Sequence, residues 1–581
     1  MRRLLVLIAL TACNTQPDDS TPDPEPKIGL DANGDGVWDG AGVDWSTDAT
    51  VPAGTNRVNL YGLADADLAS VHDAGLNHAN VWPVTVSGLL LPYEPIANLL
   101  SSENPNPDAV AISALARQAL GFGTMDEMYA WLGLPDYNDP SETGPFHTPI
   151  PPSHVDGAPM GVGVLDTQWG GALTFSCATC HTANVFGRTV VGLTNRSARA
   201  NEFFHLAAGF FPSIQPGVFE DLTGANATEM ELFTRTQEHL PAVGAVTPQV
   251  LGLDTSLAQV ALSLSRRGLD DYATRSTDTQ TSPRQNALST QVADSKPAVW
   301  WGLKYKTRWL ADGSIVSGNP IFTNFLWNEI GRGTDLHDLE DWMKDNQQII
   351  DELTVAVFST TPPSWDDFFP DAPIDEASAM RGETVFEQRC SECHGHYEKA
   401  WSNPSPTDIT PASRLRTLNV YYHDTTPVMD VSTDPMRAAG MQYFAEDLNR
   451  LAISHTMGAV VVPQAGYVPP PLDGVWMRYP YLHNGSVTSL CALLSMPVDR
   501  PALFYTGPAD DPDTDFDFDC IGLPTGDAIP ASWKAVKTAR YDTTKPGLSN
   551  AGHYDMLLDE NGDYDLSVDD RTDLIAFLKT L

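Results

Sequence analysis

The apolar residues of this chain recur at helical spacing in several separate stretches. Residues 109–116 and 125–132 place apolar side chains three to four positions apart, which predicts a packed helical region within residues 60–140. A longer stripe over residues 337–357 predicts one helix, closed by Pro362 and Pro363. We interpret its apolar face as core, formed by Leu339, Trp342, Met343, Ile349, Ile350 and Leu353.

Two further helices are predicted in the C-terminal part of the chain. Residues 374–388 carry Gly382 and Phe386 one turn apart on one face. Residues 567–581 begin at Ser567, whose side chain can cap the helix ahead of an acidic first turn. The apolar face of this last helix is formed by Leu574, Ile575, Leu578 and Leu581. Elsewhere, the 44 glycines and 45 prolines predict long, irregular connections.

Charge and composition argue against several classes of function. The chain has 34 Lys and Arg against 75 Asp and Glu, which gives a net charge of −41. This acidity argues against a nucleic-acid partner, because binding to phosphates needs Lys and Arg laid along them. It also disfavours docking on an anionic membrane through basic residues. The hydrophobic content of 42% is enough for a packed core and excludes wholesale disorder.

The first residues have the pattern of an export signal. An arginine pair precedes an apolar run at residues 4–9, which is far shorter than the ~20 residues that span a bilayer. Residues 10–13 read Leu-Thr-Ala-Cys, which resembles the lipobox of bacterial lipoproteins. We expect a signal peptide over residues 1–13 and a lipoprotein exported to the periplasmic face of the membrane or the outer membrane of a Gram-negative bacterium. Lipid on Cys13 would be its tether, and an ordinary signal peptide with a chance cysteine is the alternative.

Acidic segments follow the signal and recur near the end of the chain. Residues 14–27 are polar and Pro-rich and predict a disordered tether. Residues 31–39 alternate oxygen donors as a calcium loop does, but Gly42 stands where such a loop carries glutamate. Residues 559–570 have the donor spacing with Tyr564 in place of the glycine. Calcium at either place remains open beside a solvated acidic turn.

Four of the seven cysteines lie in two copies of the pattern C-x-x-C-H. These copies are Cys177, Cys180 and His181, and Cys390, Cys393 and His394. The spacing is typical of c-type haem attachment, in which two thiols bond to the haem vinyl groups and the adjoining histidine is the proximal iron ligand. A redox disulfide or half a zinc site is the alternative for one such pair. Because histidine follows directly in both copies, we predict two covalently bound haem c groups.

The remaining pair, Cys491 and Cys520, lies in one C-terminal stretch. In an oxidising compartment we expect it to form a structural disulfide. Two free buried thiols are the alternative, because sequence separation does not show whether the two Cα atoms come within bonding distance.

The surroundings of the second motif have the layout of a cytochrome c domain. A helix with Gly382 and Phe386 precedes it, and the last helix of the chain follows. Glycine at this position would let the two helices cross closely at the haem edge.

Further segments extend the likeness over most of the chain. They are residues 296–306 (KPAVWWGLKYK), 381–395, 471–476 (PLDGVW), 479–486 (YPYLHNGS) and 548–553 (LSNAGH). Their order resembles the bacterial dihaem cytochrome c peroxidase superfamily, most closely its large branch that includes the dihaem rubber oxygenases. The resemblance covers residues 160–581 and leaves the first 150 residues outside it.

This resemblance implies a division of labour between the haems. The haem on His181 would react with a small oxidant, peroxide or O2, and the haem on His394 would transfer electrons. For the sixth ligand of the second haem it implies His553, with His483 as the alternative and Met496 near the position of the peroxidase methionine. His483 could instead anchor a loop or a haem propionate. A bis-His haem has a lower reduction potential than a His/Met haem.

The distal side of the first haem is less defined by the sequence. Candidates for its apolar wall, and for catalytic roles between the haems, are Trp300, Trp301, Phe322 and Phe325. Adjacent tryptophans that only fill core are the alternative. Glu329 is a candidate acid for peroxide cleavage. His205 could close the site, or it could be a structural histidine.

We therefore expect a mainly α protein with long irregular loops, in which two cytochrome c-like haem domains follow an N-terminal helical extension. The expected segments are the signal peptide (1–13), tether (14–59), extension (60–159), first haem domain (160–370) and second haem domain (371–581). The expected function is a peroxidase-like dihaem oxidoreductase that takes electrons from a redox partner protein or a small donor. A non-catalytic dihaem electron-transfer protein is the alternative. Cleavage of rubber or another polyisoprenoid is a narrower alternative, since a tethered protein reaches an insoluble polymer poorly.

Overall fold

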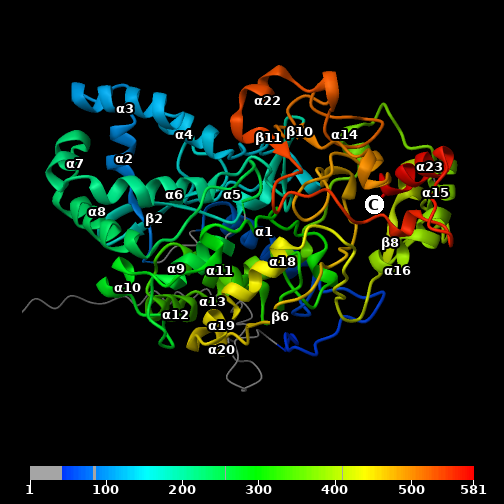
Figure 1. Ribbon diagram of the computed structural model, residues 1–581, viewed down its shortest axis with the longest axis horizontal. Helices are drawn as coiled ribbons and strands as arrows, with labels where there is room; N and C mark the ends of the chain where they lie inside the picture. Colours follow the sequence, from blue (N-terminus) through cyan, green and yellow to red (C-terminus); the bar gives the residue numbers. More distant parts are fainter. Residues whose placement is uncertain (1–41, 83–86, 255–256, 409) are drawn as a thin grey trace, which may run out of the picture.

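The computed structural model describes residues 42–82, 87–254, 257–408 and 410–581 (Figure 1). Short helices alternate with irregular connections and small antiparallel sheets. None of the helices in these ranges has the length and apolar character needed to cross a membrane.

The left-hand lobe of Figure 1 combines helices from two separate parts of the sequence. They are α2 (Tyr93–Leu99), α3 (Pro107–Leu120), α4 (Met125–Leu132), α6 (Ala200–Phe210), α7 (Pro216–Thr223) and α8 (Ala227–His239). They share an aromatic core in which Phe219 and Phe233 stack with ring centres 4.1 Å apart. Side chains of Asn106 and Thr124 cap α3 and α4, which confirm the two helices predicted in this region.

A three-stranded sheet ties this lobe to the first C-x-x-C-H motif. β3 (Gly170–Phe175) lies between β1 (Leu91–Pro92) and β2 (Val162–Thr167), and both pairings are antiparallel. β1 belongs to the expected N-terminal extension, whereas β2 and β3 belong to the expected first haem domain. Backbone hydrogen bonds therefore join these two segments.

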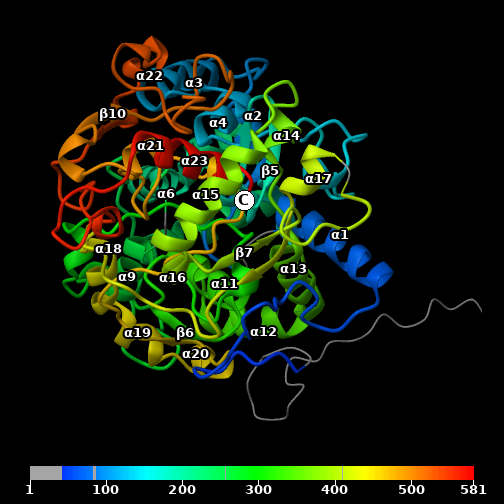
Figure 2. The same cartoon turned by 90° about the vertical axis from the view of Figure 1, so that its right-hand side faces the viewer.

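α1 (Asp65–Val81) packs along α13 (Gln347–Ser359) (Figure 2). Gly75 permits this close approach, because an added Cβ would collide with the main-chain carbonyl of Glu352. At the same contact His78 Nε2 lies 2.7 Å from Glu352 Oε2.

The apolar stripe over residues 337–357 forms two helices, so the prediction of one continuous helix is wrong. α12 (Leu336–Asp345) ends at Asn346, where φ is −117° and ψ is 27°. The Asn346 side chain donates to the Trp342 carbonyl at 2.8 Å. Asparagine bonds readily to nearby main chain and so competes with helix continuation. Four residues of the predicted apolar face, Leu339, Met343, Ile350 and Leu353, are buried, and Trp342 and Ile349 are partly buried.

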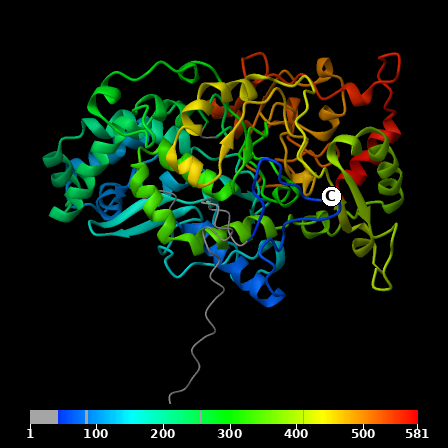
Figure 3. The same cartoon turned by 90° about the horizontal axis from the view of Figure 1, so that it is seen from below.

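The two helices predicted around the second motif are present and cross each other. α15 (Glu376–Arg389) and α23 (Val568–Leu578) lie together at the right of Figures 1 and 3. At Gly382 an added Cβ would collide with the Asp573 carbonyl. Phe386 and Phe577 pack beside this crossing with ring centres 5.1 Å apart. Arg381 fixes it from outside through hydrogen bonds of 2.7 and 2.8 Å to the Asp573 carboxylate.

The remaining helices are α5 (Ala178–His181), α9 (Leu257–Ser265), α10 (Thr277–Thr281), α11 (Pro320–Gly331), α14 (Trp365–Phe368), α16 (Ser391–His394), α17 (Pro411–Leu415), α18 (Met436–Gly440), α19 (Ala445–Asn449), α20 (Ala452–Thr456), α21 (Leu490–Leu493) and α22 (Ala531–Ala535). The remaining strand pairs are β4 (Thr182–Val185) with β5 (Arg188–Val191), β6 (Ile315–Ser317) with β9 (Val460–Val461), β7 (His396–Lys399) with β8 (Thr417–Tyr421), and β10 (Leu503–Tyr505) with β11 (Arg540–Asp542).

The main buried core runs from Val43 to Leu578 and includes residues on both sides of position 370. The β6–β9 pair also links the two expected haem domains, because Ile315 pairs with Val461. The parts that carry the two motifs are thus packed together over a common core.

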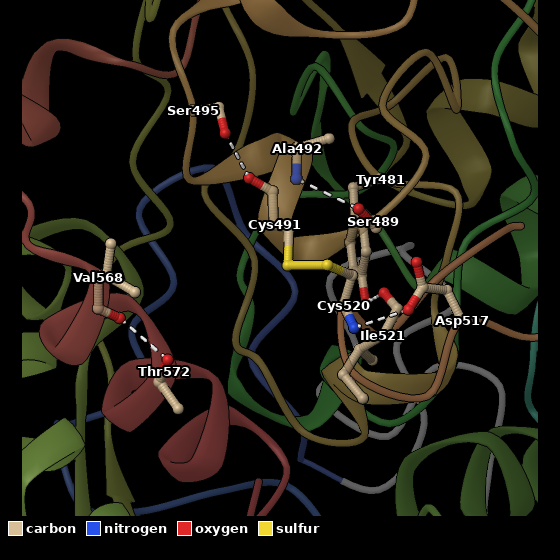
Figure 4. Close-up of a disulfide and its surroundings, with 10 residues drawn as sticks. All are labelled: Tyr481, Ser489, Cys491, Ala492, Ser495, Asp517, Cys520, Ile521, Val568 and Thr572. Atoms are coloured by element: carbon tan, nitrogen blue, oxygen red, sulfur yellow. Dashed lines mark hydrogen bonds between the residues drawn. A yellow bond between two sulfur atoms is a disulfide. The ribbon is translucent and has the colours of Figure 1, made fainter. Parts of the chain in front are cut away.

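Cys491 and Cys520, the pair expected to form a disulfide, are bonded to each other with Cα atoms 5.0 Å apart (Figure 4). The bond joins α21 to a loop in which the Cys520 N–H donates to Asp517 Oδ1 at 2.9 Å. Ser495 Oγ donates to the Cys491 carbonyl at 2.6 Å. The disulfide therefore anchors α21, whose leucines face the site described below.

Candidate functional site

The first C-x-x-C-H motif forms a single helical turn, α5, soon after strand β3. The carbonyl of Cys177 accepts hydrogen bonds from the N–H groups of Cys180 at 3.3 Å and His181 at 3.1 Å. Asn195 holds the turn from outside by donating to the Thr179 carbonyl at 2.9 Å. Side chains three or four positions apart share one face of such a turn. Both thiols and the imidazole line one cavity, which we call the first cavity.

A main-chain acceptor orients His181. Its Nδ1 lies 2.8 Å from the carbonyl oxygen of Ala298, so Nδ1 donates and Nε2 is the nitrogen left to bind a metal. Burial lowers the pKa of His181 to about 4. The imidazole is therefore neutral at physiological pH, which is the form that ligates metals.

The first cavity has about 1500 Å³ of space free of protein atoms, a volume that includes space open to solvent. One wall comes from α11, through Ile321, Asn324, Phe325 and Asn328. Among the described residues that line this cavity, His181 is the only histidine, and none is a methionine.

The second motif repeats the arrangement at the end of α15. α16 follows Cys390, and Nδ1 of His394 lies 2.8 Å from the carbonyl oxygen of Pro470. Burial lowers the pKa of His394 as well. With both thiols it lines a second cavity, which has about 1690 Å³ of space free of protein atoms, including space open to solvent. The two motifs thus present the same set of groups, each to a cavity of its own.

His553 lies across the second cavity from His394, with ring centres 6.1 Å apart. A metal ion that binds two imidazole nitrogens at about 2 Å each holds the ring centres at roughly this separation. The backbone of His553 has φ of 52°, which is uncommon outside glycine. Arg500 supports this loop by donating to the carbonyls of Gly552 at 2.9 Å and His553 at 3.3 Å. Burial lowers the pKa of His553 to about 3.

The other two candidates for that ligand position are placed differently. His483 also lines the second cavity, but its ring stacks on Tyr467 with centres 3.8 Å apart. Burial lowers its pKa to about 3. Met496 precedes a short 3-10 turn and is not among the described residues that line the cavity.

The aromatic candidates divide between the first cavity and the core. Trp300 lines the cavity, with its ring centre 5.7 Å from that of His181, and Phe325 lines it from α11. Trp301 and Phe322 are buried, but neither is among the described lining residues. Trp301 packs instead against Gly192 and Gly474.

The two polar candidates near the first motif interact with other groups of the protein. Glu329 is buried and accepts a hydrogen bond from Thr334. It lies among the charged groups that act on Arg267 and Arg332. His205 bonds the Ala245 carbonyl through Nδ1 at 3.2 Å from an exposed position on α6. Neither is among the described side chains that line the first cavity.

The stretch of chain at residues 296–311 contributes to the walls of both cavities. In this stretch the sequence had suggested a site role only for the two tryptophans. The residues that line both are Lys296, Pro297, Ala298, Leu303, Leu310 and Ala311. Other cationic side chains line one cavity each: Arg332 and Arg437 line the first, and Lys306 and Arg478 line the second. The sequence gives no signal for these residues, because the wall forms only when distant segments of the chain meet.

These groups fit haem c. Each cavity offers two cysteine thiols for thioether links and a neutral, oriented imidazole for the iron. Apolar side chains predominate around the second cavity, and Lys296, Lys306 and Arg478 on its wall could pair with the carboxylate side chains of a haem.

The proposed calcium and lipid sites divide between described and undescribed residues. Cys13 and residues 31–39 lie outside the described residues. At the second acidic run, Asp559 accepts hydrogen bonds from the N–H groups of Asn561 at 2.8 Å and Asp563 at 2.9 Å. Within residues 42–82, 87–254, 257–408 and 410–581, no group of three or more His, Cys, Asp or Glu is placed to hold a metal ion.

Comparison with known proteins bears on the second cavity. A family model described as RoxA-like, cytochrome c-like, matches residues 466–505. This segment is similar to cytochrome c. It contains Pro470, which orients His394, and also Arg478, His483 and the leucines of α21 that line the cavity. A cytochrome c-like domain implies covalently bound haem c.

Two curated relatives, both from Sinorhizobium fredii (strain NBRC 101917 / NGR234), share part of the sequence. The uncharacterized protein y4iJ is 31% identical over 268 residues, which are 38% of this chain and 41% of y4iJ. The uncharacterized protein y4iM is 31% identical over 223 residues, 36% of this chain and 49% of y4iM. The chain thus spans less than half the length of each.

Proposed function

We propose that this protein is an exported dihaem c-type cytochrome oxidoreductase with peroxidase-like activity. The observation that carries the proposal is the difference between the two cavities. His181 is the only histidine among the described residues of the first, whereas His394 and His553 oppose each other in the second. At the first site His181 would hold a haem iron alone, which would leave room for peroxide or O2, whereas at the second site His394 and His553 would both hold it.

A bound haem supplies one-electron chemistry at its iron. The chain supplies orientation and environment. The Ala298 carbonyl fixes the tautomer and plane of His181, and Trp300 packs near the same imidazole. Phe325 contributes an apolar surface on α11, and Asn328 donates to Asn324 Oδ1 at 3.0 Å on the same wall. This wall offers amide groups to a small oxidant, and the carboxyl group of Asp254 lines the same cavity elsewhere.

The wall common to both cavities supports an electron route between the sites. Reduction of one peroxide molecule to two water molecules takes two electrons and two protons. In the proposal an external redox protein or small reductant supplies the electrons, which enter at the second site. Residues 296–298 line both cavities and so connect the two sites through covalent bonds.

The proposal includes export and lipidation, supported by the sequence of residues 10–13. Substitution Cys13→Ser is expected to move the protein from the membrane fraction to the soluble periplasmic fraction. Retention of this variant in the membrane would contradict the tether and leave the haem chemistry untouched.

Visible and EPR spectra of the purified protein test the difference between the sites. We expect one low-spin haem and one that is high-spin, or that opens after partial reduction, and only the latter should bind cyanide and react with peroxide. Turnover of peroxide with a reduced electron donor should accompany these signals. Two low-spin signals unmoved by reduction, cyanide or peroxide would instead support a dihaem electron carrier.

A further inference from the structure

Lys296 lies between the two cavities and lines both of them. Of the described cationic side chains that line either cavity, it alone lines both. Its Nζ donates to the carbonyl of Arg478 at 3.1 Å and to the carbonyl of Pro480. The main-chain N–H of Lys296 donates to the His483 carbonyl at 2.9 Å. Main-chain carbonyls of the segment similar to cytochrome c therefore hold both the backbone and the ammonium group of Lys296.

The charges around Lys296 call for an anion. The ionisable groups that act on it are Arg478 and Arg196, which are both cations. Burial and these two arginines lower the pKa of Lys296 to about 7, so the ammonium form is costly here unless an anion compensates. Carboxylates are abundant elsewhere in the chain, so this arrangement is not forced by composition. The anions that haem would bring are its carboxylate side chains.

We propose that the Lys296 ammonium is a counter-ion shared by the carboxylate side chains of both haems, and so a positioning residue that couples the two sites. The inference rests on the proposed function, because it needs a haem in each cavity. Lys306 offers a matched comparison, since it lines the second cavity but is not among the described residues of the first.

A positive charge near a haem favours the ferrous state, so its removal lowers the reduction potential. A charge shared by two haems should act on both, and a charge at one cavity mainly on one. Lys296→Gln is therefore expected to lower the equilibrium constant for reduction of ferric to ferrous iron in both haems by roughly threefold to twentyfold. This range is the one expected for a unit charge about 10 Å away at an effective dielectric near 20. Lys306→Gln should lower that of the second haem chiefly, and Lys296→Arg, which keeps the charge, should leave both close to wild type.

The test is a spectroelectrochemical titration of the wild type, K296Q, K296R and K306Q, each first assayed for haem content by pyridine haemochrome. The first haem is identified by cyanide binding. The inference is supported if both variants bind two haems, both midpoint potentials are lower in K296Q, and both stay at the wild-type values in K296R. It is overturned if K296Q moves one midpoint or neither, or if K296R moves them as much as K296Q does. Should K296Q fail to load haem, recovery of two haems in K296R supports it and failure of K296R overturns it.

The haem assay separates this inference from the proposed function. A wild-type protein with fewer than two haems defeats the proposed function itself. If two haems are bound and neither midpoint potential changes in K296Q, only the shared counter-ion is contradicted.

Discussion

His394 and His553 face each other in the second cavity with ring centres 6.1 Å apart, although one belongs to the C-x-x-C-H turn and the other to a loop near the last helix. Two main-chain constraints set this relationship. The Pro470 carbonyl orients His394, and Arg500 holds the carbonyls on either side of the His553 backbone turn. A haem between these rings would be bis-His, and hence of low potential.

Substitution His553→Ala should convert the second haem from low spin to high spin, because it removes the imidazole opposite His394. EPR and visible spectra of the ferric protein measure the change. His483→Ala is the matched control and should leave the second haem low-spin, since the His483 ring stacks on Tyr467. High spin in the His483 variant, with His553→Ala unchanged, would reverse the ligand assignment.

Loss of the disulfide should destabilise the protein without removing haem attachment. The bond closes a loop with a sequence separation of 29, for which chain entropy gives about 3–4 kcal/mol in the free energy of unfolding. The double variant C491A/C520A, unfolded in urea and followed by circular dichroism, measures this loss. Wild type reduced by dithiothreitol should match the variant. Equal stability of the variant and the oxidised wild type would show that the bond has no structural role.

Substitution Gly382→Ala should weaken the α15–α23 crossing, because the added methyl group would collide with the Asp573 carbonyl. The expected loss is about 2–3 kcal/mol or more in the free energy of unfolding. Gly209→Ala on α6 is the control, since an added Cβ there has no described atom within 4 Å. The control should be neutral or stabilising by up to ~1 kcal/mol. Similar effects of both variants would contradict the close crossing.

The Arg381–Asp573 pair should make stability depend on acid pH. Hydrogen bonds from Arg381, and then from Ser378, hold the pKa of Asp573 below its ordinary value against the opposing effect of burial. A group with a lowered folded pKa stabilises fully above its unfolded pKa of ~3.9 and loses this contribution as pH falls through the folded pKa. The difference in unfolding free energy between wild type and Asp573→Asn should thus be constant near neutral pH and shrink below about pH 4. A difference that grows with acid would contradict this sign.

Local patterns in the sequence were enough to predict the features that depend on near neighbours. The helices α3, α4, α15 and α23 follow from apolar spacing and capping residues, and α5 and α16 place the thiols and histidine of each motif on one cavity. The break at Asn346 was missed, because apolar periodicity continues across a single residue that leaves the helix. Hydrophobicity alone also did not separate Trp300, at the cavity, from Trp301, in the core.

Features that depend on distant parts of the chain could not be read from spacing. The shared wall at Lys296 exists because the 479–486 segment folds back on it through main-chain bonds, with Pro480 accepting from the lysine. The pairing of Ile315 with Val461 likewise joins regions that the sequence pattern treats as separate domains. Burial of a lysine beside arginines appears only when these segments meet.

Covalent attachment of two haems is the central claim, and intact-mass measurement of the denatured, purified protein tests it most directly. The account predicts a polypeptide that carries two haem additions, reduced to one in the C177S/C180S variant and in the C390S/C393S variant. A wild-type mass without haem, or with a single haem that survives in both variants, would contradict it.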